Sequence, residues 1–395
     1  MNDALTESTL GEIFEISSSK RVLRKQWRKE GIPFYRAREM VKLARDGKVD
    51  NELFISEDLF SELTVRFGSP QPGDLMVSAV GTLGACYVVQ PGDRFYFKDA
   101  SVIRLSPKQP VCPGYFRHAF RTKLILDQIN SGSGSTVGTF TISRAKNTRV
   151  PLPSLKEQKR IAAILDAADA LRAKRRETLA QLDTLLQSTF LEMFGDPVTN
   201  PKGWPKARLN DVSDRIIDCP HSTPKWSQSG VICLRTSNLG KGEWNWADTR
   251  FVTEADYQKR TKRSEIEPND IILSREGTIG VMALVSRGMR VCMGQRLVQI
   301  RVAPEQIAPK YLLHLLLHDL DPERIGRLMA GSTSKHLNVK ELRSLPILVP
   351  PLPVQDEFST IASAIEQQKS RLRAHLDELD TLFGSLQARA FAGEL

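Results

Sequence analysis

The fold is decided by residues 155–194, which read LKEQKRIAAILDAADALRAKRRETLAQLDTLLQSTFLEMF. This stretch contains no glycine or proline, and its apolar residues recur at heptad-like spacings, among them Ile161, Ala168 and Leu182. The pattern predicts a single helix about 60 Å long, at 1.5 Å per residue. Gly195-Asp196-Pro197 follows as a strong stop signal.

A second stretch of the same kind begins after Pro350-Pro351. Its apolar stripe comprises Phe358, Ile361, Ile365, Leu372, Leu376, Leu379, Leu382 and Leu386. A narrow apolar stripe on so long a helix needs a partner of equal length. We therefore expect the two helices to pack together as an antiparallel, coiled-coil-like pair with one globular unit at each end. The alternative is two unrelated helical hairpins that solubilise neighbouring domains.

The chain repeats itself at an offset of 196 to 197 residues. Five matches occur in the same order: PGDL at 72–75 with PNDI at 268–271, GTLG at 81–84 with GTIG at 277–280, PGYF at 113–116 with PKYL at 309–312, GST at 134–136 with GST at 331–333, and LDTL at 182–185 with LDTL at 379–382. The repeat predicts two copies of one architecture. The paired glycines of GTLG and GTIG are interpreted as tight turns rather than DNA contacts.

Glycine and proline punctuate the sequence before each long helix, separating short apolar runs such as 75–80 and 86–89. This texture is typical of an α+β unit. The predicted organisation is an α+β domain at 1–151, a helical spacer at 152–197, a second α+β domain at 198–349 and a second helical spacer at 350–395.

Composition excludes several classes of protein. The chain has 395 residues, 41% hydrophobic and 26% charged, which excludes collagen-like and wholly disordered proteins. No apolar run approaches the roughly 20 residues of a membrane span, and no secretory signal follows Met1, so we expect a cytoplasmic protein. The five cysteines never form Cys-x-x-Cys, which predicts buried thiols and neither a disulfide framework nor a metal site.

The net charge of +10 favours an anionic partner such as nucleic acid. Residues 17–48 contain eleven Lys and Arg but only three Asp and Glu. Trp27, Phe34 and Tyr35 lie among these cations, and cations beside aromatic rings suit phosphates and bases. The competing interpretation is a solvated face with no partner.

No catalytic motif is recognisable. Residues 200–203, NPKG, lack the second proline and the aromatic residue of an adenine methyltransferase loop, and neither Gly-Lys pair fits a Walker loop. His314 and His318 would share a helix face, but the glutamate of a metalloprotease helix is absent. We therefore predict no catalytic or metal-binding residue and a non-enzymatic binding role. A diverged enzyme and a protein-binding scaffold remain as alternatives.

These residues resemble the specificity subunit of type I restriction–modification systems over nearly the whole chain. The motifs that support the resemblance are PNDIILSREGTIG at 268–280, LPSLKEQKRI at 152–161, FLEMFGDP at 190–197 and ARAFAGEL at 388–395. The second helix opens with PPLPVQD at 350–356, where the family usually has Glu-Gln, so this segment departs slightly. A specificity protein of a related phage-defence system would look much the same.

The resemblance implies two target-recognition domains that each read one half of a bipartite site in double-stranded DNA. It implies partners: two modification subunits that methylate adenine with S-adenosylmethionine, and restriction subunits that hydrolyse ATP with Mg²⁺ and cleave DNA as an endonuclease. This chain would hold no cofactor itself.

Candidate DNA-binding residues follow from the side chains that contact phosphates and base edges, above all Arg, Lys and Asn. In the first domain they are Lys20, Arg21, Arg24, Arg36, Arg38, Ser133, Ser135 and Thr136. In the second domain they are Arg235, Thr236, Asn238, Arg275, Ser332, Thr333, Lys335 and His336. Residues 31–38 align with 230–237, which pairs Arg36 with Arg235. Trp244 and Trp246 are interpreted as core residues on one strand face rather than as base-stacking residues.

Overall fold

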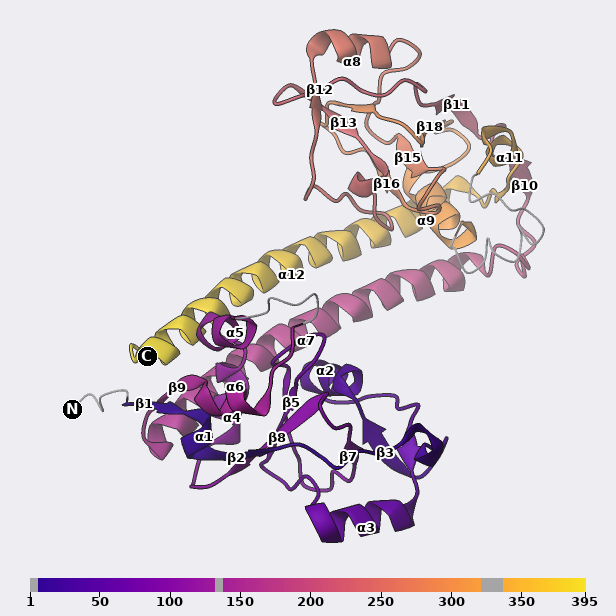
Figure 1. Cartoon of the computed structure of the whole chain (residues 1–395). Helices are drawn as coiled ribbons and strands as arrows, with labels where there is room; N and C mark the ends of the chain where they lie inside the picture. Colours follow the sequence, from indigo (N-terminus) through magenta and orange to yellow (C-terminus); the bar gives the residue numbers. More distant parts are fainter. Residues whose placement is uncertain (1–5, 132–137, 321–336) are drawn as a thin grey trace. The chain divides into compact units, whose positions relative to one another are not determined.

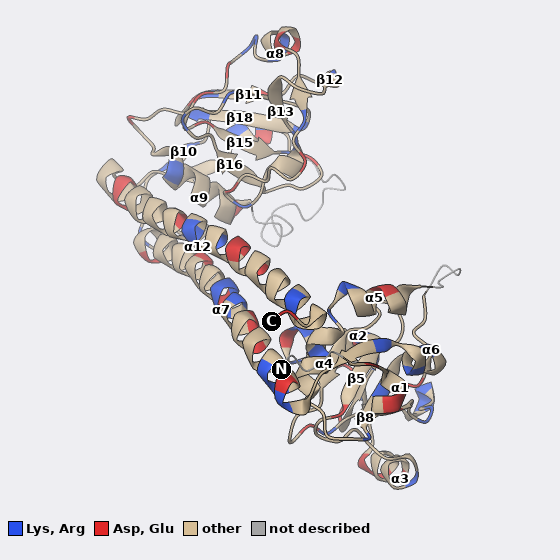
Figure 2. Cartoon of the chain, turned by 90° about the vertical axis from the view of Figure 1, so that its left-hand side faces the viewer, with Lys and Arg blue, Asp and Glu red and all other residues tan. Residues whose placement is uncertain are grey.

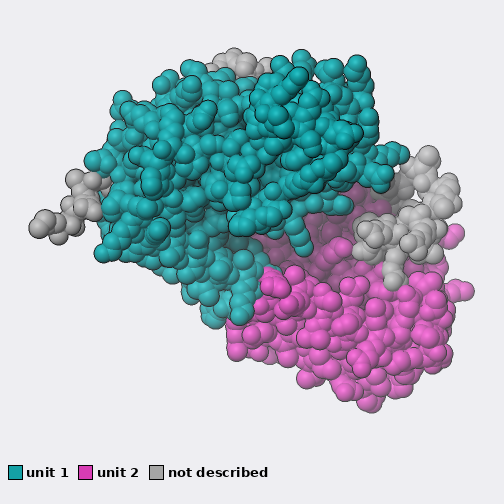
Figure 3. Space-filling view, turned by 90° about the horizontal axis from the view of Figure 1, so that it is seen from below, with its two compact units in different colours: residues 1–176, 374–395 teal, residues 177–373 magenta. Residues whose placement is uncertain are grey.

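A computed structural model describes residues 6–131, 138–320 and 337–395. The chain divides into two compact units, one formed by residues 1–176 with 374–395 and the other by residues 177–373 (Figure 3). Each unit contains one α+β domain and part of both long helices. Among the described residues, no helix is long and apolar enough to cross a membrane.

The first unit has a four-stranded antiparallel sheet and a smaller three-stranded sheet (Figure 1). The larger sheet has the order β2 (Phe14–Ser17), β8 (Val102–Pro107), β5 (Leu75–Ser78), β6 (Cys86–Val88), and the smaller has the order β4 (Phe54–Ile55), β3 (Ile32–Tyr35), β7 (Tyr96–Phe97). Strands β3 and β7 are parallel, and β1 (Thr6–Thr9) pairs with β9 (Arg149–Leu152). The helical elements are α1 (Leu10–Ile13), η1 (Arg24–Gln26), α2 (Ala37–Asp46), α3 (Glu57–Phe67), α4 (Pro113–Ala119), α5 (Lys123–Asn130) and α6 (Ile142–Asn147).

The second unit repeats this topology, with one additional edge strand, β12, in its smaller sheet. Its larger sheet has the order β11 (Ser213–Asp218), β18 (Leu297–Val302), β15 (Ile271–Ser274), β16 (Met282–Leu284), and its smaller sheet has the order β12 (Trp226–Ser227), β14 (Phe251–Val252), β13 (Val231–Leu234), β17 (Val291–Met293). Strand β10 (Lys206–Arg208) pairs with β19 (Pro346–Leu348), as β1 pairs with β9. The helical elements are η2 (Thr236–Asn238), α8 (Glu254–Arg260), α9 (Pro309–Asp319) and α11 (Val339–Arg343). The predicted duplication of an α+β domain is confirmed.

The repeated Pro-x-Asp motif builds the same buried turn in both units. The middle residues Gly73 and Asn269 have φ values of +91° and +74°, a region that glycine and asparagine tolerate best. In the first unit, Arg104 Nε donates to the buried Asp74 carboxylate at 2.6 Å. In the second, Arg301 Nε donates to Asp270 at 2.8 Å. The repeated motif is therefore explained by a structural ion pair, which joins the turn to β8 in the first unit and to β18 in the second.

A buried glutamine joins each domain to its long helix. Gln158 Oε1 accepts from the Cys112 N–H at 3.0 Å, and its Nε2 donates to the Pro153 carbonyl at 2.9 Å. Gln355 makes the equivalent bonds, accepting from the Ala308 N–H at 2.8 Å and donating to the Pro350 carbonyl at 2.7 Å. The departure at 350–356 from the usual sequence keeps this glutamine, so the junction is intact in both units.

The two long helices, α7 (Leu155–Phe194) and α12 (Leu352–Ala392), lie antiparallel within each unit. In the first unit, Arg172 of α7 bonds Asp380 of α12 at 2.5 Å. In the second, Asp183 of α7 pairs with Lys369 of α12 at 2.5 Å. The two ion pairs are related by the 197-residue offset. The expected antiparallel pair is confirmed, and separate helical hairpins are excluded.

The apolar stripe is not buried at every predicted position. Leu171 and Leu185 on α7 and Leu382 on α12 are about half exposed. Leu185 and Leu382 occupy equivalent positions in the repeated LDTL motif. The heptad pattern therefore predicts the helix pair but does not show where the two helices leave a leucine exposed.

The last turns of α12 complete the core of the first unit. Phe391 packs against Tyr115 with ring centroids 5.0 Å apart, and Phe383 and Ala390 are buried in the same cluster. Tyr115 also donates to the Pro151 carbonyl at 2.8 Å, and its counterpart Tyr311 donates to the Leu348 carbonyl at 3.0 Å.

All five cysteines are free thiols. Four of them are buried, and Cys112 is partly buried.

Replacing Gln158 with Met tests the junction. The variant keeps the side-chain volume but leaves the Cys112 N–H and the Pro153 carbonyl without partners, which costs about 2–4 kcal/mol. We expect faster amide hydrogen exchange at 112–120 and 155–162. Gln181 is exposed on the same helix, so Gln181→Met should leave exchange unchanged. Equal effects in the two variants would contradict a structural role for Gln158.

Candidate nucleic-acid interface

The loop between β2 and β3 presents exposed cations without acidic partners. Lys20, Arg21, Arg24, Lys25 and Lys29 are exposed, and no ion pair to a carboxylate involves them within the described part of the chain. Two contacts fix the backbone of this loop to the domain. The Lys20 N–H donates to the Tyr96 hydroxyl at 3.1 Å, and the Val22 side chain is buried. A fixed backbone with free cationic side chains is suited to phosphate groups.

Arg36 and Arg38 differ from these cations because both bond carboxylates. Arg36 donates from Nε and Nη2 to the two oxygens of Glu39, at 3.0 and 2.8 Å. Arg38 bridges Glu39 and Glu52, at 3.0 and 2.7 Å, and remains half exposed. Arg36 fixes the start of α2, so the geometry gives it a structural role, whereas the exposed part of Arg38 can still reach a ligand.

Glu39 is 2% exposed. Burial alone would raise the pKa of its carboxyl, but the bonds from Arg36 and Arg38 outweigh burial and hold the pKa at about 2. The carboxylate is therefore charged across the physiological range, and it anchors both arginines.

The second unit repeats this arrangement with an amide in place of the carboxylate. The Arg235 N–H donates to Asn238 Oδ1 at 2.9 Å, and the Asn238 amide donates to the Asn245 and Asp248 carbonyls at 3.0 and 3.2 Å. Arg235 pairs with Asp248, and Thr236 follows it, half-buried, in η2. Asn238 has no exposed surface, so geometry lends no support to its reading of a base.

Arg275 is also buried. Its Nε lies 3.0 Å from Asp218 Oδ1 and its Nη1 lies 3.3 Å from Glu276 Oε1. The side chain is 8% exposed, which suits a bond between β15 and the end of β11 better than a DNA contact. Its assignment to DNA stays a prediction without geometric support.

Seven candidates lie outside the described residues: Ser133, Ser135 and Thr136 in the first domain and Ser332, Thr333, Lys335 and His336 in the second. Their assignment stays a prediction.

The core interpretation holds for Trp244, which is partly buried against a core cluster, and is corrected for Trp246. Trp244 and Trp246 do not lie on a strand, and Trp246 is 43% exposed. Trp246 stacks on Trp244 with centroids 5.2 Å apart, and Trp244 Nε1 donates to the Leu284 carbonyl at 2.9 Å. The alternation of residues suggests a strand face, but the turn after η2 bonds Trp244 to β16 and leaves Trp246 stacked on Trp244.

Sequence reasoning missed two exposed features of the second unit. Lys259, Lys262 and Arg263 are exposed cations around the end of α8, and Trp226 is 40% exposed on β12. The four basic residues among residues 259–263 are a sequence signal that indicates this cluster of cations. The alignment that pairs Gly31 with Gly230 also pairs Trp27 with Trp226.

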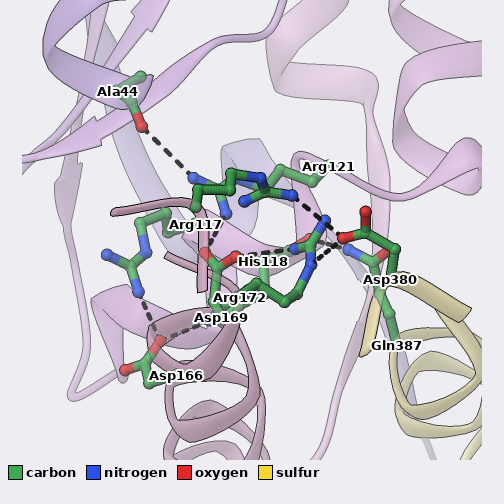
Figure 4. A network of polar contacts seen from close by, with 10 residues as sticks. Ala44, Arg117, His118, Arg121, Asp166, Asp169, Arg172, Asp380 and Gln387 are labelled. Atoms are coloured by element: carbon green, nitrogen blue, oxygen red, sulfur yellow. Dashed lines mark hydrogen bonds and ion pairs between the residues drawn. The ribbon is translucent and has the colours of Figure 1, made fainter. Parts of the chain in front are cut away.

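His118 contacts the carboxylate of Asp166 where the first domain packs against α7, and the contact has a structural role (Figure 4). His118 Nε2 and Arg117 Nη2 each lie 2.5 Å from Asp166 Oδ1. Burial, the largest influence, lowers the pKa of His118. Its ring has no exposed surface for a substrate to reach, and no group of His, Cys, Asp or Glu among the described residues could hold a metal.

Replacing Glu39 with Gln should destabilise α2 at neutral pH. Because the folded pKa of Glu39 lies below its ordinary value of 4.5, its contribution is present above pH 4.5 and disappears as the pH falls towards 2. We expect a loss of about 2–3 kcal/mol at pH 7 that shrinks at pH 3, measured by hydrogen exchange in residues 37–46. Glu62→Gln removes only an exposed partner of Arg66 and should change little at either pH. A pH-independent difference would refute the ion-pair account.

Comparison with known proteins agrees with this architecture. The model of the type I restriction modification DNA specificity domain matches residues 2–182 and 201–379. The MjaVIII specificity subunit of Methanocaldococcus jannaschii, a type I restriction enzyme subunit, is 23% identical over 238 residues, which cover 56% of this chain and 55% of that protein. The EcoBI specificity subunit of Escherichia coli is 24% identical over 316 residues, which cover 71% of this chain and 65% of that protein. The chain therefore spans between about half and two-thirds of the length of these two relatives.

Two solved structures share the fold. The type I restriction–modification S subunit from M. genitalium has a TM-score of 0.58 at 15% identity, covering 99% of this chain and 97% of that one. A chain in a structure of a type I R-M system has a TM-score of 0.58 at 19% identity, covering 99% of this chain and 98% of that one. With the specificity-domain model matching both halves, the chain belongs to the type I restriction–modification DNA specificity family.

Proposed function

We propose that the chain is the DNA-reading subunit of a type I restriction–modification assembly, with one half of a bipartite site read by each α+β domain. The observation that supports this most directly is a duplicated scaffold with unlike surfaces. The Asp74 and Asp270 turns, the Gln158 and Gln355 junctions and the strand order of the larger sheet are the same in both units. The loops that follow β3 and β13 differ: one forms α2 and the other contains the stacked tryptophans. Two readers of different half-sites need this combination.

We further propose that catalysis resides in partner subunits. Among the described residues, no group of His, Cys, Asp or Glu could hold a metal ion. In this proposal, modification subunits methylate adenine with S-adenosylmethionine, and restriction subunits hydrolyse ATP with Mg²⁺ and cleave the DNA. In this proposal the chain recognises the DNA site and catalyses no reaction itself.

Equivalent features on the two helices favour two copies of the modification subunit. Leu185 of α7 is 49% exposed and Leu382 of α12 is 50% exposed, and the repeat makes them counterparts. Charged residues of both signs follow one another along both helices (Figure 2). Exposed leucines among charges are suited to a protein partner, and a duplicated surface can accept the same partner twice.

Exchange of one domain tests the two-reader proposal. Replacing residues 1–151 with the corresponding domain of another family member should change one half of the methylated motif in the host genome and leave the other half intact. Sequencing of methylated adenines gives both results, and deletion of the gene should abolish the motif. A change in both halves in several independent exchanges would contradict separate readers.

Lengthening α7 tests whether the helices set the gap between half-sites. We propose that they do, because α7 is continuous from one unit into the other. Inserting four residues after Thr178 adds about 6 Å, about one helical turn, and nearly preserves the phase of the stripe. At about 3.4 Å per base pair, we expect one or two additional unspecified pairs between unchanged half-sites. Methylome sequencing of an active mutant that retained the original gap would refute the proposal.

A further inference from the structure

The exposed cations of the first unit lie at one corner of its domain. The loop between β2 and β3 approaches the C-terminal end of α3, where Lys20 Nζ lies 5.5 Å from the centroid of the Phe67 ring. Arg21, Arg24 and Lys25 follow in the same loop, exposed and without acidic partners among the described residues. Arg66, the cation of α3 itself at this end, is paired with Glu62 at 3.1 Å. The free charge of this corner therefore comes from the loop.

The second unit has the same corner, because its loop between β11 and β12 meets the C-terminal end of α8. Arg260, buried at the end of α8, donates from Nη1 and Nη2 to the Ser222 carbonyl at 3.2 and 3.3 Å. Its Nε donates to the Met293 carbonyl at 2.8 Å. Arg260 thus fixes the loop against the helix. Helices α3 and α8 are counterparts, since each follows the strand that pairs with β3 or β13.

The sequences at this corner are unlike. The loop residues 18–31 contain six basic residues and one acidic residue, whereas the aligned residues 217–230 contain one basic residue (Lys225) and one acidic residue (Asp218). The second unit has instead Lys259, Lys262 and Arg263 at the end of α8, exposed and without acidic partners in the described ranges. Figure 2 shows basic residues on α8 and the loop beside it. Each unit thus places a cluster of free cations at the same corner but takes it from a different segment.

We propose that this corner is where each unit holds the phosphate backbone of duplex DNA. Clustered like charges without partners repel one another and do not stabilise the fold, so their recurrence at one position in two unlike sequences points to an anionic ligand. Lys and Arg on a fixed loop or helix end neutralise several phosphates without reading bases. The inference rests on the proposed DNA-reading function and deepens it by separating backbone-holding residues from those that set specificity.

The test compares four charge-neutralised forms of the full chain, each purified with the subunits that co-purify with it. Two forms change the corners: Arg21→Gln with Arg24→Gln and Lys25→Gln, and Lys259→Gln with Lys262→Gln and Arg263→Gln. Two matched forms remove three exposed cations elsewhere in each unit: Lys42→Gln with Lys48→Gln and Lys146→Gln, and Lys206→Gln with Arg208→Gln and Arg287→Gln. Affinity for a fluorescent random-sequence duplex is measured by anisotropy between about 50 and 200 mM salt.

We expect each corner form to lose roughly tenfold or more in affinity at the low-salt end, with the slope of log affinity against log salt reduced by about two to three. The matched forms should lose less than about threefold, since distant surface charges are largely screened. Methylome sequencing should show the same methylated motif for every form, because phosphate contacts do not choose bases.

Equal losses in corner and matched forms, or none in either corner form, would overturn the proposal while leaving the DNA-reading function intact. A slope near zero for the unaltered assembly would instead refute that function. Corner forms that bind the duplex normally but no longer co-purify with their subunits would identify the corner as a protein-binding surface and overturn the proposal.

Discussion

Burial of the apolar stripes on α7 and α12 is the constraint on which the rest of the structure depends. An isolated helix of this length gains little stability without tertiary packing, and the sheets of a small domain cannot cover it. In each unit the two long helices contact each other, and an ion pair joins them: Arg172 with Asp380 in the first unit and Asp183 with Lys369 in the second. Because each long helix runs through both units, each unit obtains part of its helical pair from a segment distant in sequence.

The sequence was most informative where both copies need the same residue to fold. Asp74 and Asp270 each close a turn and pair with an arginine, and Tyr115 and Tyr311 each bond the carbonyl that precedes a long helix. Such residues recur at a fixed offset because the scaffold has no substitute for them. Repetition therefore predicted the topology, the turns and the two helices.

The candidate site was harder to predict for the same reason. Arg36 and Arg235 align in the two copies, and each is the residue at the start of a helical element, α2 or η2. An asparagine side chain can hydrogen-bond adenine, but the Asn238 side-chain NH₂ already donates to the Asn245 and Asp248 backbone carbonyls. Burial and partners depend on contacts across the fold, which composition and spacing do not show. Residues that distinguish one reader from the other should be sought where the two copies differ.

The contribution of residues 383–391 to the first core has a consequence for synthesis of the protein. Domains usually fold in the order in which they leave the ribosome. Here Tyr115 is covered by Phe391, so the N-terminal unit cannot close its core until nearly the whole chain has been made. The second unit, residues 177–373, is contiguous in sequence and can fold first. A ribosome that stops anywhere in between releases a first unit with an open apolar face, a natural substrate for chaperones and proteases.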